Sequence, residues 1–321
     1  MGQKNIADSL ADLIGRTPLL RPHNFCRLAG IKTELLFKLE SFNPTGSVKD
    51  RTALAMILEA EKKGLLTGGS VITAPTLVNT GLALAMLAAA RGYRILVTMP
   101  ESLNPDRVRH LKALGAEVFL TPWEEGIRGA VRRAEELAAE NPKAVLLNQL
   151  TSPANPEVHQ TATAEEIWQD TGGRVDIFVA GAGTGGTVTG VGRGLKAKKR
   201  TIRIIAVEPA GSAVLSGEEP GLHHLHGLGP GFVPPVLDPE VCDEIFQVSN
   251  AEALAAARVL ARTEGLMTGI SSGAAAFAAA KTALRPENAG RTIAALLPDT
   301  GERYLNSVLF REVPETVCQD G

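Results

Sequence analysis

The chain has 321 residues, of which 44% are hydrophobic and 21% charged, a composition typical of a globular protein with one large or two smaller domains. Lys and Arg number 33 against 35 Asp and Glu, which gives a formal net charge of −2. No global positive charge is therefore present to attract nucleic acid or an anionic membrane.

The cysteines and the N-terminal sequence argue against metal, secretion and membrane insertion. Cys26, Cys242 and Cys318 lie far apart, and no Cys/His spacing typical of zinc appears. The N-terminus has no hydrophobic signal core, and apolar runs such as 82–90 are too short to span a bilayer. We therefore expect a cytoplasmic protein without a metal site.

Strand-like apolar runs alternate with helix-like ones along almost the whole chain. Alternation of this kind is typical of an α/β fold, and we expect two mostly parallel sheets with helices on both faces. One sheet is expected around residues 46–150 and the other after about 155, with a break at 151–156, where two prolines occur. The predicted strands are 35–39, 70–73, 93–99, 117–120, 144–147, 175–180, 203–207 and 292–297, and the predicted helices are 48–63, 80–91, 104–114, 127–140, 159–171, 187–198, 251–264 and 273–284.

Lys49 is the first candidate for chemistry. Pro44 and Gly46 interrupt the preceding structure, Ser47 is a natural N-cap, and the helix predicted from residue 48 follows. The positive end of the helix dipole disfavours a cation in the first turn, so Lys49 is better accommodated as a neutral amine or an imine. A solvated surface lysine is the alternative that this segment alone leaves open.

A glycine loop follows the strand predicted at 175–180. Strand, glycine loop 181–187 and helix together form an anion site, because free N–H groups and the helix dipole both favour a phosphate. The loop also satisfies G-x-G-x-x-G through Gly181, Gly183 and Gly186, and Glu208 ends the next strand, where a dinucleotide fold places a ribose-binding acid. A nicotinamide-dependent oxidoreductase is therefore a rival interpretation.

Taken together, these motifs resemble the cysteine synthase (O-acetylserine sulfhydrylase) family of fold-type II pyridoxal-phosphate enzymes. The resemblance covers nearly the whole chain and fits the two open twisted sheets expected above. The segments that carry it, in order, are 14–19, 43–51, 148–149 with 153–156, 183–190, 227–235, 269–274 and 298–304.

The resemblance implies a role for individual residues. Lys49 would bind pyridoxal 5'-phosphate as a Schiff base and later act as general base and acid. The cofactor phosphate would be held by Gly183, Thr184, Gly185, Gly186 and Thr187, its ring hydroxyl oxygen would contact Asn79, and its ring nitrogen would face Thr300. The substrate would be bound by Thr76, Leu77, Asn79, Thr80, Gln149 and Gly227.

The implied reaction is a ping-pong β-replacement. An O-activated L-serine loses its β-group, an aminoacrylate remains, and a small nucleophile, sulfide in the family, adds to it. A larger domain, 1–45 plus 155–321, would bind the cofactor phosphate, and a smaller mobile domain, 46–154, would carry the lysine and the substrate loop. The family also implies a homodimer and a possible partner, the C-terminal tail of serine acetyltransferase.

The substrate loop departs from the family pattern. The family sequence is Thr-Ser-Gly-Asn-Thr-Gly, whereas this chain has Leu77 and Val78 at the second and third positions. In addition, Leu150 occupies a position where the family usually has phenylalanine. Leu77 removes a hydroxyl donor, and a β-branched residue such as Val78 disfavours positive φ. The hypotheses are an altered amino-acid substrate or nucleophile, a slow cysteine synthase, or a cofactor-binding regulatory paralogue with little activity.

A histidine cluster lies in the loop 211–235. The members are His223, His224 and His226, and no carboxylate or cysteine completes a metal set. We expect this loop to be a mobile rim that closes over substrate.

Overall fold

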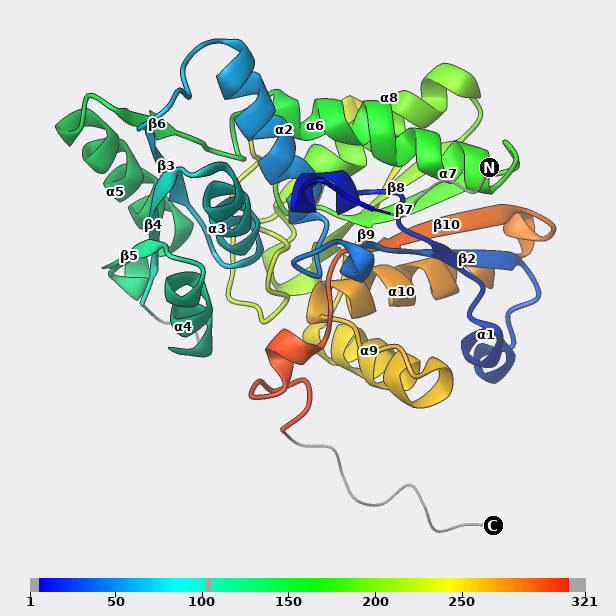
Figure 1. Ribbon diagram of the computed structural model, residues 1–321. Helices are drawn as coiled ribbons and strands as arrows, with labels where there is room; N and C mark the ends of the chain where they lie inside the picture. Colours follow the sequence, from blue (N-terminus) through cyan, green and yellow to red (C-terminus); the bar gives the residue numbers. More distant parts are fainter. Residues whose placement is uncertain (1–5, 102–104, 312–321) are drawn as a thin grey trace.

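The computed structural model describes residues 6–101 and 105–311, and these form the predicted α/β architecture (Figure 1). Within them, one sheet has the order β1-β2-β10-β7-β8-β9 and a second has the order β5-β4-β3-β6. Every pair is parallel except β1 with β2. The strands are β1 (Leu19–Leu20), β2 (Glu34–Leu39), β3 (Val71–Pro75), β4 (Arg94–Pro100), β5 (Glu117–Thr121), β6 (Ala144–Leu146), β7 (Ile177–Gly181), β8 (Arg203–Pro209), β9 (Glu244–Val248) and β10 (Thr292–Leu297).

Helices cover both faces of each sheet. In Figure 1, α9 and α10 lie on one side of the larger sheet with α7 and α8 on the other, while α5 and α3 flank the smaller sheet. The helices are α1 (His23–Ala29), α2 (Lys49–Lys62), α3 (Asn79–Arg91), α4 (Pro105–Ala113), α5 (Gly126–Glu140), α6 (Ala154–Val158), α7 (Ala164–Asp170), α8 (Gly186–Lys198), α9 (Asn250–Glu264) and α10 (Ile270–Ala283), with η1 (Leu10–Leu13) a short 3-10 turn near the N-terminus.

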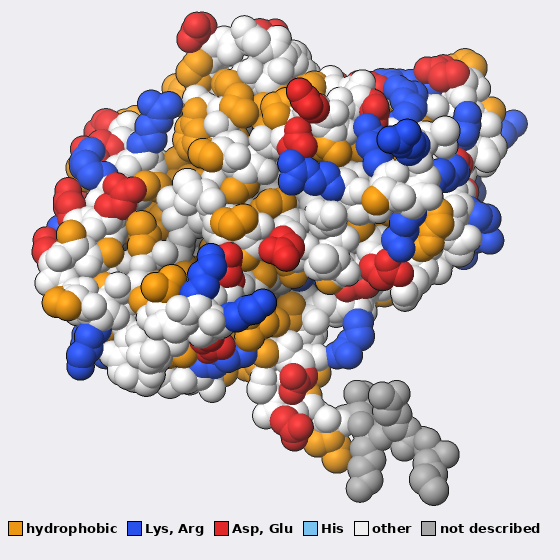
Figure 2. Space-filling view, turned by 90° about the horizontal axis from the view of Figure 1, so that it is seen from above, with side chains coloured by type: hydrophobic (Ala, Val, Ile, Leu, Met, Phe, Trp, Pro, Cys, Tyr) orange, Lys and Arg blue, Asp and Glu red, His pale blue; other side chains and the backbone are white. Residues whose placement is uncertain are grey.

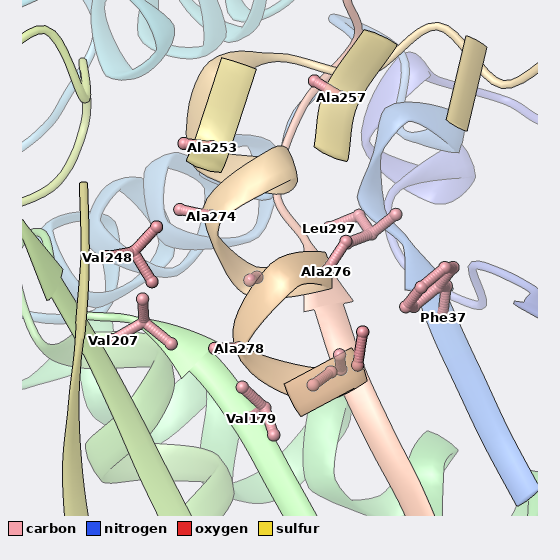
Figure 3. Close-up of a cluster of buried hydrophobic side chains, with 14 of the residues drawn as sticks. Phe37, Val179, Val207, Val248, Ala253, Ala257, Ala274, Ala276, Ala278 and Leu297 are labelled. Carbon is pink, nitrogen blue, oxygen red and sulfur yellow. The ribbon is translucent and has the colours of Figure 1, made fainter. Parts of the chain in front are cut away.

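The helix α10 packs closely on the larger sheet because its buried positions carry small side chains. Figure 3 shows Ala278 facing Val179 of β7, with Ala274 turned towards Ala253 of α9. At Gly273 a Cβ atom would lie 2.1 Å from the carbonyl oxygen of Ala253, so α9 and α10 approach more closely than any side chain would permit. The low aromatic content of the chain is reflected in this alanine-rich core.

The strands divide between the sheets according to their place in the chain. The smaller sheet takes its strands from residues 71–146, and the larger sheet takes its strands from 19–39 and 177–297. The smaller sheet lies in the range expected for it, whereas the larger sheet takes β1 and β2 from before residue 46 in addition to the strands expected after about 155. Among the helices of the described residues, none is long and apolar enough to cross a membrane.

Most predicted boundaries lie within two residues of the observed ones, and the larger errors have physical causes. The helix predicted from residue 159 already begins at Ala154, because Pro153 and Pro156 fall at its N-cap and in its first turn, where no helical N–H bond is lost. It continues through a π turn (His159–Thr163) into α7. The prediction missed β9, a half-buried edge strand of mixed polarity, and the short helix α1.

Candidate active site

Lys49 is the first residue of α2, and its half-buried side chain lines a cavity between elements of the two sheets. The predicted N-cap is wrong by one residue, because Val48 occupies that position with helical φ and ψ angles. The Ser47 hydroxyl still accepts a hydrogen bond from the Lys49 N–H at 3.3 Å. The Val48 N–H donates to the carbonyl oxygen of Pro298 at 2.8 Å, which joins the start of α2 to the end of β10.

The surroundings of Lys49 increase the neutral fraction of its amine. Loss of hydration lowers the pKa of Lys49 to about 8, although the carboxylates of Asp299 and Glu40 act in the opposite direction. An ordinary lysine has a pKa of about 10.4, so Lys49 has a far larger neutral fraction near pH 7. This is the protonation state that a Schiff-base lysine needs.

An ion-pair cluster fixes the helix turn that carries Lys49. The buried guanidinium of Arg51 contacts Glu40 at 2.7 Å and Glu166 at 2.6 Å. Burial acts to raise the pKa of Glu166, but the bonds from Arg51 and Lys38 outweigh it and lower the pKa to about 2. These ion pairs hold α2 against α7 and against the turn at Glu40 that follows β2.

Most of the predicted site residues meet in one cavity. Ten of them are among the described residues that line it: Lys49, Leu77, Asn79, Thr80, Gln149, Gly183, Thr184, Gly185, Thr187 and Gly227. They come from α2, α3, the loop after β6, the β7–α8 loop and the loop 211–235. Residues far apart in the sequence thus converge as the family motifs implied.

The glycine loop between β7 and α8 requires its glycines. A Cβ atom on Gly183 would lie 2.0 Å from the carbonyl oxygen of Gly227, and Gly185 has φ +83°, which favours glycine. The main-chain N–H groups of Gly185 and Thr187 donate no hydrogen bond to another described residue. A helix N-terminus with free donors is a binding site for an anion such as a phosphate.

Two of the predicted site residues, Thr76 and Gly186, lie behind the cavity wall and do not line it. Thr76 does not line the cavity, and its hydroxyl accepts a hydrogen bond from the N–H of Gly81 at 2.9 Å. Gly186 is also absent from the lining, and a Cβ atom there would lie 2.1 Å from Oδ1 of Asn155. Both residues shape their loops without facing the cavity.

The structure does not support the role predicted for Thr300. Thr300 is not among the cavity-lining residues, and it packs at Gly46, to whose carbonyl oxygen its N–H donates at 3.1 Å. Ser271, in the first turn of α10, does line the cavity, and its hydroxyl makes no hydrogen bond to another described residue. The motif 269–274 was the available signal for Ser271, but the sequence reasoning gave that motif no role.

The substrate loop keeps the N-terminus of α3 open despite its two unusual residues. Val78 has φ −176° and ψ −69°, so its backbone is extended in φ and needs no glycine. The main-chain N–H groups of Asn79 and Thr80 donate no hydrogen bond to another described residue, and they can receive a carboxylate. The Thr80 hydroxyl donates to Oε1 of Gln149 at 2.6 Å. Leu77, which is 37% exposed, adds apolar surface to the wall.

The side chain of Asn79 is held by the C-terminal part of the chain. Its Nδ2 donates to Oδ2 of Asp299 at 2.9 Å, and its Oδ1 accepts a hydrogen bond from Arg303. The Tyr304 hydroxyl donates to the same Asp299 oxygen at 2.7 Å. These bonds must rearrange if Asn79 is to contact a cofactor ring.

Sequence reasoning missed Arg107 and Tyr304 as wall residues. Both line the cavity, and the guanidinium carbon of Arg107 lies 5.6 Å from the centroid of the Tyr304 ring. Tyr304 lies in the motif 298–304 without a local signal that places it in a cavity, and Arg107 has no distinguishing neighbours in the sequence.

Glu208, the acidic residue on which the rival dinucleotide interpretation depends, is not available to bind a ribose. The carboxylate of Glu208 is 1% exposed and accepts hydrogen bonds from the N–H groups of Leu215, at 2.8 Å, and Ser216, at 3.1 Å. It does not line the cavity and has no free oxygen directed to a ribose. No group of three or more His, Cys, Asp or Glu side chains arranged for a metal is found in residues 6–101 and 105–311.

Comparison with known proteins agrees with this geometry. Residues 10–299 match the family of pyridoxal-phosphate dependent enzymes. The chain belongs to this family. It is 47% identical over 313 residues to the probable cysteine synthase of Bacillus subtilis, covering 95% of this chain and 98% of that protein.

Solved structures of family members share the fold. The cysteine synthase of Entamoeba histolytica superposes with a TM-score of 0.93 at 42% identity, covering 99% of this chain and 94% of that one. An O-ureido-L-serine synthase superposes with a TM-score of 0.90 at 41% identity, covering 98% of each chain. Enzymes named for different β-substituents therefore have this backbone.

The residues present fit pyridoxal phosphate, the cofactor of the family. A lysine of lowered pKa and a glycine loop with free N–H donors line the same cavity. The close approach of Gly183 to Gly227 leaves no room for a side chain where a phosphate would contact the backbone. The cavity thus offers both the amine and the anion site that the cofactor requires.

Proposed function

We propose that this protein is a cysteine synthase-like enzyme, which uses pyridoxal phosphate to replace the β-substituent of an O-activated L-serine. The observation that carries the proposal is the presence of Lys49, with its pKa of about 8, in the same cavity as the glycine loop 183–187. The similarity to cysteine synthases over 95% of the chain supports the O-acetylserine and sulfide pair as the default reactants.

Bound pyridoxal phosphate would supply an electron sink for the carbanion at the substrate's α-carbon. Lys49 Nζ would remove the α-proton and hold it, and its lowered pKa makes the neutral amine that accepts a proton more abundant than in an ordinary lysine. The N–H groups of Asn79 and Thr80 would fix the α-carboxylate, and Gln149 would orient the Thr80 hydroxyl. The N–H groups of the 183–187 loop would hold the cofactor phosphate.

We assign the contact with the ring nitrogen to Ser271 in place of Thr300, because only the first of these lines the cavity. A neutral hydroxyl at that position does not force protonation of the ring nitrogen, which suits β-elimination over transamination. The role of Asn79 at the ring hydroxyl oxygen remains a proposal that requires release from Asp299 and Arg303.

Leu77 and Val78 bear on which substrate is used. Their side chains line the cavity at the N-terminus of α3, where the family has a hydroxyl and a glycine. We propose that they change the preference for the amino acid or the nucleophile without closing the carboxylate site, since the N–H groups of Asn79 and Thr80 are still free. Leu150, which also lines the cavity, would add to the change.

We also propose that residues 46–154 move as a unit against 1–45 and 155–321.

We further propose that the protein is a cytoplasmic homodimer. Apolar side chains gather on the face that carries η1 and α2, seen from above in Figure 2. Leu13 is 48% and Leu58 45% exposed there, beside a hollow that includes Ile14. Sedimentation of the purified protein tests the dimer. Docking of a serine acetyltransferase C-terminal tail in the active site stays a prediction.

The decisive experiment is a spectral titration of the protein purified with pyridoxal phosphate. We expect visible cofactor absorbance that Lys49→Ala alters, and a change of this absorbance on adding O-acetyl-L-serine that sulfide reverses with formation of cysteine. Cofactor absorbance with no response to any amino acid would favour the regulatory paralogue. A protein that binds no cofactor would refute the proposal.

A further inference from the structure

Arg107 is a cation in the cavity wall that the reaction proposed above does not use. It lies in the first turn of α4, and its Nε is buried without a hydrogen-bond partner in the part of the chain that the structure describes. No Asp or Glu is among the described residues that line the cavity. A guanidinium with free donors in a partly dry cavity is well suited to bind an oxyanion through two parallel hydrogen bonds.

The other anionic groups of the reaction already have sites. The cofactor phosphate is matched by the N-terminus of α8, and the α-carboxylate by the N–H groups of Asn79 and Thr80 at the N-terminus of α3. Arg107 belongs to neither of these two helix termini. The charge of Asp299 acts on it, but Oδ2 of Asp299 already accepts hydrogen bonds from Asn79 and Tyr304, so the donors of Arg107 are available for a third anionic group.

His226 accompanies Arg107 on the same wall. It lines the cavity from the loop 211–235, and desolvation followed by the charge of Arg107 lowers the pKa of its ring. The ring is therefore neutral near pH 7 and offers one N–H donor without adding charge. The Tyr304 ring, 5.6 Å from the guanidinium carbon of Arg107, completes the wall.

We propose that Arg107, assisted by His226, forms a second anion subsite for an oxyanion on the β-carbon side of the substrate. This oxyanion belongs either to the leaving group of the amino acid or to the incoming nucleophile. The inference rests on the proposed function, because it assigns a substrate class to that cavity. A phosphate ester and a sulfur oxyanion share the relevant chemistry, which is a negative charge spread over several oxygens.

The test compares reactants with and without an oxyanion in the cofactor-loaded enzyme. O-Phospho-L-serine against O-acetyl-L-serine probes the leaving group, and thiosulfate against sulfide probes the nucleophile. The variants are Arg107→Gln, Arg107→Lys and the matched control Arg109→Gln, because Arg109 lies two residues further along α4 with a side chain 79% exposed. Calorimetric titration of thiosulfate provides a binding readout that does not depend on turnover.

In each pair, kcat/KM for the reactant with an oxyanion is divided by kcat/KM for the reactant without one. We expect Arg107→Gln to lower this ratio by about 10- to 100-fold, the effect of one charge-assisted hydrogen-bond pair. Arg107→Lys should recover part of the ratio, and Arg109→Gln should change it by less than about 2-fold. An effect confined to O-phospho-L-serine identifies the leaving group as the source of the oxyanion, and one confined to thiosulfate identifies the nucleophile.

Two results would overturn the subsite. One is an equal loss with all four reactants, which would make Arg107 a structural residue. The other is a wild-type enzyme that neither turns over nor binds either oxyanion reactant. Failure of the proposed function has a different signature, in which no amino acid alters the cofactor absorbance while thiosulfate still binds and Arg107→Gln weakens it.

Discussion

The N-termini of α3 and α8 face the same cavity and are built in opposite ways. The loop before α8 contains Gly183 and Gly185, whose surroundings or backbone angles exclude other side chains. The loop before α3 carries Leu77 and Val78, whose side chains line the cavity and whose backbone makes no such demand. A helix terminus that binds a constant group can be fixed by close backbone contact, whereas one that meets a variable substrate can change its side chains.

The largest effect is expected at the α8 terminus. Gly183→Ala places a Cβ atom 2.0 Å from the carbonyl oxygen of Gly227, a backbone atom that has little freedom to move. We expect the affinity for pyridoxal phosphate to fall by at least about 100-fold, measured from cofactor absorbance, because the phosphate loop must shift. Gly68→Ala is the control, since no atom lies within 4 Å of its added Cβ. Retention of full affinity in Gly183→Ala would show that the loop is not rigid.

Lys49, at the start of α2, provides a pH-dependent test of the cavity between these termini. Cofactor capture needs the neutral amine, and the lowered pKa of about 8 means that this form is half of the total at about pH 8 and most of it one pH unit higher. We expect the rate of cofactor uptake by the apoprotein to rise about tenfold between pH 7 and pH 9 and then to level off. Nα-acetyl-lysine, measured in parallel, corrects for ionisation of the cofactor. A rate that keeps rising through pH 10 would mean that Lys49 titrates like a solvated lysine.

At the α3 terminus we expect a smaller change, which is a gain in activity and not a loss. Leu77→Ser restores a hydroxyl donor beside the carboxylate site and removes apolar surface from the cavity wall. We expect kcat/KM for O-acetyl-L-serine to rise by about 3- to 10-fold, the effect of one hydrogen bond. Val78→Gly alone should have a smaller effect, because φ −176° is accessible to valine. Leu222→Ser, at a side chain that is 94% exposed, is the control. A fall in kcat/KM for Leu77→Ser would indicate that this enzyme prefers another substrate.

The sequence predicted the terminus of α8 from a local signal and the terminus of α3 from the family resemblance. Glycines between a strand and a helix indicate an anion site, and apolar periodicity indicates the strands and helices around it. Arg107 and Ser271 could not be found in this way, since their place in the cavity depends on how α4 and α10 pack against other elements. The bonds of Asn79 to Asp299 and Arg303 likewise join segments more than 200 residues apart, a distance over which periodicity carries no information.

The effect of a single hydrogen bond also distinguishes two hydroxyl groups, Ser271 at the N-terminus of α10 and Thr300 beside Gly46. Only Ser271 lines the cavity, so Ser271→Ala should weaken cofactor binding by about 3- to 10-fold and shift its absorbance, as loss of one hydrogen bond would. Thr300→Ala removes packing against Gly46. It should change cofactor affinity by less than about 2-fold and lower thermal stability slightly. If Thr300→Ala weakened cofactor binding more than Ser271→Ala, the contact with the ring nitrogen would belong to Thr300. In that case the segment that follows β10, and not the N-terminus of α10, would complete the cofactor site.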